Sequence, residues 1–136
     1  MPTDNAELAR SAIEAFNRRD YDAGLILLDA AVVWTVGAEL QVDAGVYTGR
    51  DGVRRYWDLW HETFEDFELV IEECTEAPQG HAVAVVRSHG WGAGSGAEVL
   101  SSPFVQVFRI RDGLITHVWL HVRRERALKA AGMDVA

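Results

Sequence analysis

The stretch FVQVFRIRDGLITHVWLHV, residues 104–122, decides the fold class of this chain. Polar and apolar side chains alternate on both sides of Asp112-Gly113, as they do in half-buried β-strands. The Asp-Gly pair is typical of a type I′ turn, whose two central residues have positive φ. The stretch therefore predicts an antiparallel hairpin between strands at 97–111 and 114–122.

The two faces of this predicted hairpin differ in character. In the first strand the apolar side carries Phe104, Gln106, Phe108 and Ile110, and in the second it carries Thr116, Val118, Leu120 and Val122. The other side of the second strand carries Ile115, His117, Trp119 and His121. We expect the apolar sides in the core, where the amide of Gln106 needs a hydrogen-bond partner or a ligand.

The residues around the hairpin predict three helices and further strands. Apolar residues at helical spacing predict helices that start near Asp4, Asp20 and Asp51 and run over 4–18, 21–28 and 51–64. Further strands are expected at 31–36, 66–76 and 81–92, a short extended piece at Val46–Tyr47, and a last helix at 123–131. The order predicts an α+β fold in which a curved antiparallel sheet wraps around three N-terminal helices and encloses a conical cavity.

Composition narrows the class of protein. The 136 residues fit one domain, 1–136, and 49% apolar residues suffice for a core. The net charge of −8 disfavours nucleic acid and anionic membranes as partners. No stretch reaches the roughly 20 apolar residues of a membrane helix. With the lone Cys74 and no signal-peptide pattern, we expect a cytoplasmic protein.

Neither the histidines nor the glycines match a metal or phosphate motif. On a strand, His117 and His121 are roughly 13 Å apart, too far to bind one ion. The glycines at 90–96 are followed by neither a helix nor a Lys-Ser/Thr pair. We expect no metal and no cofactor.

The face with His117 and Trp119 is a candidate interface. Aromatic residues are enriched where subunits meet. His89 and Trp91 share the corresponding face of the 81–92 strand. We expect a homodimer through this face.

A candidate pocket lies on the opposite face. The aromatic stripe of the third helix needs a surface to cover, and the alternate residues of the last two strands face it. The expected lining residues are Trp34, Tyr56, Trp60, Phe104, Gln106, Val118 and Leu120. Such a lining suits a hydrophobic small molecule, aromatic and carbonyl-bearing.

Four segments, 12–29, 46–57, 111–118 and 126–133, resemble the SnoaL-like polyketide cyclase group within the nuclear transport factor 2-like superfamily, which includes ketosteroid isomerase. The resemblance implies the fold expected above. The isomerase needs an Asp base, a Tyr and a neutral carboxylic acid. At the corresponding positions this chain has Trp34, Ala12 and either Val105 or Gln106, so isomerase activity is not expected.

Three functions stay open from the sequence. The chain binds or transforms a hydrophobic metabolite without an assigned reaction. Alternatively, it is a cyclase, isomerase or dehydratase whose general acid or base is His89, His121 or Asp43, with Gln106 or Tyr47 polarising a carbonyl. As a third alternative, it is a non-catalytic dimeric partner protein.

Overall fold

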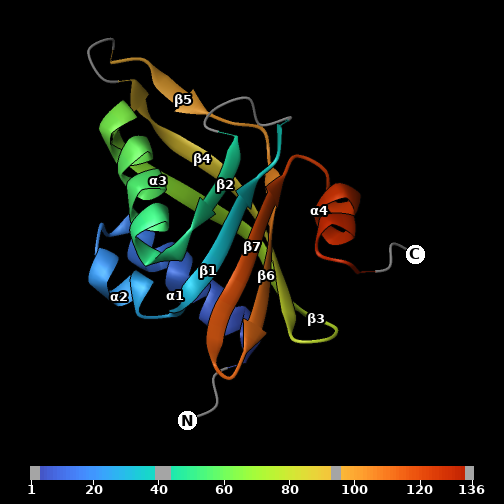
Figure 1. The fold of residues 1–136 in the computed structure, drawn as a ribbon. Coiled ribbons are helices and arrows are strands. Elements are labelled where there is room, and N and C mark those ends of the chain that lie inside the picture. The colour runs from blue at the N-terminus through green and yellow to red at the C-terminus, as the bar shows by residue number, and fades with distance from the viewer. Residues whose placement is uncertain (1–3, 39–43, 93–95, 134–136) are drawn as a thin grey trace.

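Three helices cover one side of a mixed sheet and a fourth helix covers the other side (Figure 1). The computed structural model describes residues 4–38, 44–92 and 96–133. The helices are α1 (Asn5–Asn17), α2 (Tyr21–Leu25), α3 (Gly49–Thr63) and α4 (Arg124–Ala130). The strands are β1 (Leu28–Val36), β2 (Gly45–Thr48), β3 (Phe64–Ala77), β4 (His81–Gly92), β5 (Glu98–Leu100), β6 (Phe104–Arg111) and β7 (Leu114–His121). The predicted α+β class with N-terminal helices is confirmed. No described helix is both long enough and apolar enough to cross a bilayer.

The sheet is mostly antiparallel, with one parallel pair. Its strand order is β2-β1-β7-β6-β4-β3, and β5 pairs with β4. The pairs β6–β7, β4–β6 and β3–β4 form the predicted meander. However, β1 lies parallel to β7, so the prediction of a wholly antiparallel sheet is wrong. The chain passes through β2, α3 and the other strands between them, a connection long enough for parallel pairing.

Several predicted boundaries shift. Helix α3 begins after Thr48, and Asp51 lies in its first turn rather than at the N-cap. The predicted strand 97–111 divides into β5 and β6 around Ser101–Pro103, because proline has no N–H for the ladder. Strand β1 begins at Leu28, which shortens the second helix to five residues. The hairpin turn is as predicted, since Asp112 and Gly113 have φ of 53° and 77°.

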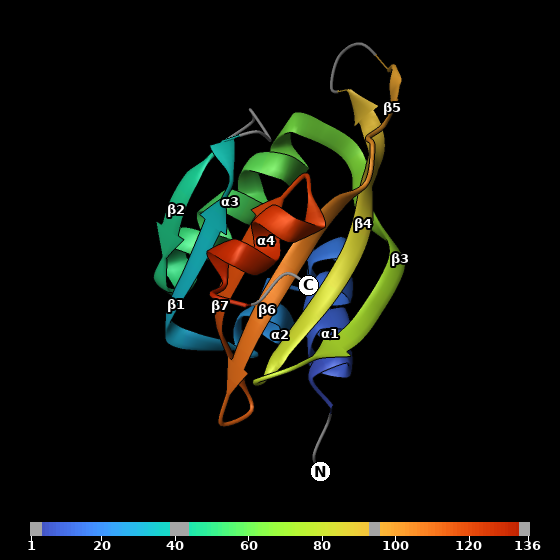
Figure 2. The same ribbon diagram turned by 90° about the vertical axis from the view of Figure 1, so that its right-hand side faces the viewer.

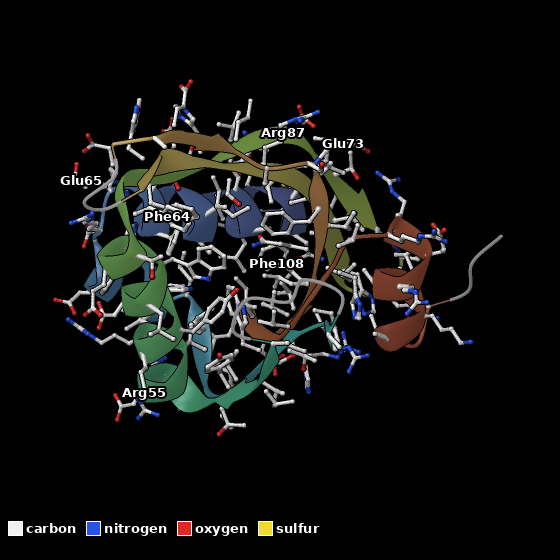
Figure 3. All side chains as sticks on the ribbon, turned by 90° about the horizontal axis from the view of Figure 1, so that it is seen from above. Arg55, Phe64, Glu65, Glu73, Arg87 and Phe108 are labelled. Carbon is white, nitrogen blue, oxygen red and sulfur yellow. The ribbon has the colours of Figure 1, made fainter. Side chains whose placement is uncertain are left out.

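The pleat of the sheet separates two buried clusters. The larger lies between the sheet and α1–α3 and contains Trp57, Phe108 and Leu28. Figure 3 shows Phe108 pointing into this interior, whereas Arg87 and Glu73 point away from it. The smaller cluster lies under α4, which Figure 2 shows in front of β6 and β7 on the opposite face. Both faces of the sheet's centre are therefore covered.

Candidate functional site

A cavity opens between α1, α3 and the inner face of the sheet. Its outer part has a volume of about 330 Å³ and its inner part about 40 Å³. The two parts share the side chains of Tyr56, Trp60, Phe67, Ser88, Phe104 and Leu120. The inner part continues between α1 and the sheet, past Phe16, Trp34, Gln106 and Phe108. The outer part has the size of a small-molecule site, and the inner part holds only a few atoms.

Aromatic contacts fix the wall that α3 supplies. Tyr56 and Trp60 are four residues apart, so they share one face of the helix. The ring of Trp60 stacks on Phe67 at a centroid distance of 5.2 Å and meets Tyr56 edge-on at 6.3 Å. Trp34 of β1 lies 6.1 Å from Tyr56. These rings brace one another, so the wall is set before any ligand arrives.

Two polar atoms on the inner lining lack partners within the described part of the chain. They are Oε1 of Gln106 and Nε1 of Trp34. The residues are 2% and 4% exposed, respectively. An unpaired buried polar group costs about 1–3 kcal/mol. An acceptor and a donor are therefore available at the inner end of the cavity.

Six of the seven residues that the sequence suggested for a pocket lie on this cavity. They are Trp34, Tyr56, Trp60, Phe104, Gln106 and Leu120. Val118 is fully buried and is not part of the lining. In the sheet it lies between Trp34 and Phe108, and these two larger side chains reach the cavity instead.

The residues suggested for acid–base chemistry lie elsewhere. His89 is on the outer face, with Nε2 2.9 Å from Glu98 and Nδ1 3.5 Å from Glu68. The hydrogen bond to Glu98 raises the pKa of His89. The ring of Tyr47 packs on Tyr56 at 4.7 Å, outside the lining. His121 is likewise not a lining residue.

The remaining candidate, Asp43, lies outside the described residues. The described lining contains hydroxyl, amide and indole groups but no carboxylate, histidine, lysine or arginine. Among the described side chains, no three of His, Cys, Asp and Glu gather closely enough to hold a metal ion. The chemistry that this lining offers is neutral hydrogen bonding and aromatic contact.

The outer face carries its own aromatic stack. His117 stacks on Trp119 at 5.3 Å, and the guanidinium of Arg109 lies 4.9 Å from the Trp119 ring. Burial lowers the pKa of His117. Arg109 also donates to the carbonyl of Ala131 just beyond α4, and Trp119 packs against the cluster under that helix. Helix α4 therefore covers part of the face that the sequence suggested for a partner subunit.

The sequence reasoning missed His61. It is buried, its ring stacks on Phe16 at 4.3 Å, and its Nδ1 forms a hydrogen bond with the hydroxyl of Tyr21. Burial lowers the pKa of His61 to about 4. The signal was present, because Val53, Trp57 and His61 follow one another at four-residue steps on the buried face of α3. His61 lies behind Phe16 and Phe67, whose rings it contacts and which line the cavity.

Solved structures share this fold. A protein of Catenulispora acidiphila with a ketosteroid isomerase-like fold, in complex with trimethylamine, is 16% identical, with 94% of each chain covered and a TM-score of 0.73. A protein of Xanthomonas campestris, provisionally assigned as a polyketide cyclase, is 23% identical over 90% of this chain and 92% of its own, with a TM-score of 0.73. TerC, co-crystallised with polyporic acid, is 17% identical over 93% of this chain and 99% of its own, with a TM-score of 0.74.

At these identities the structures establish the fold alone. No curated protein matches the sequence. The family model described as SnoaL-like domain matches residues 9–118, which include every element from α2 to β6 and most of α1. The chain therefore belongs to the SnoaL-like domain family.

Proposed function

We propose that this protein binds an uncharged, flat and largely apolar molecule with a carbonyl group in the cavity between α3 and the sheet. One observation carries the proposal: a cavity with aromatic walls ends at the buried indole N–H of Trp34, a hydrogen-bond donor that has no partner among the described residues. Aromatic walls favour a flat ring system, and a buried polar group gives it direction.

The volume of the cavity supports a ligand of one or two rings. The outer part, at about 330 Å³, falls at the lower end of small-molecule sites. Burying about 150 Å² of apolar ligand surface contributes about 4 kcal/mol before the cost of association. Two structures of the same fold were determined with small molecules, trimethylamine and polyporic acid. We therefore expect weak affinity, nearer millimolar than nanomolar, for a simple aromatic ketone.

The lining favours binding over acid–base catalysis. General acids and bases must lie within hydrogen-bond reach of the reacting atoms, and the described lining has no group that titrates near neutral pH. A cyclase or isomerase reaction would need a carboxylate or an imidazole at the ligand. We therefore propose that the bound molecule leaves the cavity unchanged.

The test is a calorimetric titration with 2-acetylnaphthalene. We expect binding to the unaltered protein, weakening of at least tenfold in Trp60→Ala, which removes a wall, and no change in Trp91→Ala. Trp91 is the matched control because it lies beside His89, away from the lining. If both variants bind as tightly as the unaltered protein, or if nothing binds, the ligand site is not this cavity.

We also propose that two copies associate through the outer face of the sheet. The supporting observation is the half-buried stack of His117 and Trp119, which α4 covers only in part. Light scattering tests it. A mass near 30 kDa, twice the 15.1 kDa of the chain, supports association, and a mass of 15.1 kDa contradicts it.

A further inference from the structure

We propose that the inner end of the cavity selects ligands by the functional group that enters it first, called here the leading group. The preferred leading group both accepts and donates a hydrogen bond. Carboxamides have such a group, and so do carbonyls next to an enol or phenol hydroxyl. The inference rests on the proposed function, because it assumes that a ligand enters this cavity. It adds the chemical class that the cavity prefers and assigns Trp34 as a residue that determines specificity.

The two unpartnered atoms have opposite polarity. The indole N–H of Trp34 can only donate, and Oε1 of Gln106 can only accept. The residues come from β1 and β6, which flank β7 in the sheet, and both line the same inner volume of about 40 Å³. A ligand carbonyl can accept a hydrogen bond from Nε1 of Trp34 but leaves Oε1 of Gln106 unpaired. A leading group with a donor beside its acceptor satisfies both.

The inner volume also limits size and charge. About 40 Å³ has room for two or three atoms of the size of a water molecule, which is a functional group and not a ring. The ring system therefore stays in the outer part, between Trp60 and Phe104. An ion at the inner end would find no opposite charge in the described lining, and an unpaired buried charge is strongly unfavourable. The leading group is therefore neutral.

Three naphthalenes of nearly equal shape separate these contributions. 2-Naphthamide has an acceptor and a donor, 2-acetylnaphthalene has a methyl group in place of the amide nitrogen, and 2-isopropylnaphthalene has neither function. By calorimetry on the unaltered protein, we expect each added hydrogen bond to tighten binding by about five- to tenfold. This series requires no variant to fold.

Two variants assign the hydrogen bonds. Gln106→Leu should abolish the preference for 2-naphthamide over 2-acetylnaphthalene and keep that for 2-acetylnaphthalene over 2-isopropylnaphthalene. Trp34→Phe keeps a ring in the wall and should abolish the second preference, whereas Trp91→Phe should keep both. If the unaltered protein binds all three compounds equally, the two polar atoms do not select the ligand, and the inference is wrong while binding of a flat, apolar molecule in this cavity stands. If it binds none, the proposed function itself has failed.

Discussion

Acid should destabilise this protein through His61. The ring is 9% exposed, and burial lowers its pKa from 6.5 to about 4. The unfolded chain therefore takes up a proton on this residue at a higher pH than the folded chain. The stability due to neutral His61 is complete above pH 6.5 and falls as the pH drops toward 4.

The size of the effect follows from the two pKa values. A difference of about 2.5 units limits the total loss to about 3 kcal/mol, and about 2 kcal/mol of it falls between pH 7 and pH 5. Urea unfolding followed by tryptophan fluorescence at both pH values measures it. The variant His61→Phe keeps a ring on Phe16. Between pH 7 and pH 5 it should lose about 2 kcal/mol less stability than the unaltered protein.

His89→Gln is the matched control for this experiment. His89 has a raised pKa because of Glu98, so its contribution is present at low pH and is lost as the pH rises. Removing it should not reduce the loss of stability in acid. If His61→Phe loses as much stability between pH 7 and pH 5 as the unaltered protein, His61 is not buried in its neutral form and the reasoning is refuted.

Three further experiments test packing, backbone geometry and assembly. Phe108→Ala should cost about 3–5 kcal/mol in urea unfolding, whereas Val46→Ala, at a side chain 62% exposed, should cost under about 0.5 kcal/mol; equal losses would contradict the assigned core. Gly80 and Gly113 both have positive φ, so Gly113→Ala should cost about 1–2 kcal/mol of stability. Gly80→Ala should cost more, because there the added Cβ also comes within 2.9 Å of a backbone oxygen. Melting temperatures in the reverse order would contradict this. Trp119→Asp should halve the mass of the proposed dimer in light scattering, with circular dichroism confirming that the variant is folded; an unchanged dimer mass would place the interface elsewhere.

The hairpin and the long helix could be predicted because their signals are local. Asp112-Gly113 fixes a turn by its own backbone preference, and the alternation on either side identifies the inward residues of β6 and, from Val118 onward, those of β7. It is wrong for Ile115, which a register shift before His117 turns into the larger cluster. The stripe from Val53 to Trp60 likewise identifies α3 and the face that it buries, whereas Phe64, predicted as its last member, begins β3. The lining residues that α3, β6 and β7 supply follow from these two faces, with Val118 as the exception, whereas those that α1, β3 and β4 supply were not predicted.

The features that the sequence did not reveal depend on distant contacts. No local pattern in β1 indicates that its neighbour in the sheet is β7, so the parallel pair could not be predicted. Helix α4 covers part of Trp119, and this contact depends on how the chain turns back after β7. His61 stands where the four-residue steps from Val53 and Trp57 indicate a buried position, but its hydrogen-bond partner, Tyr21, comes from α2 and could not be predicted.

A crystal structure of the protein with 2-acetylnaphthalene tests the central claim most directly. The account predicts the naphthalene rings in the outer cavity between Trp60 and Phe104, with the carbonyl group leading toward Trp34 and Gln106. Density for the ligand on the outer face of the sheet, or a cavity that stays free of ligand at saturating concentration, would contradict it.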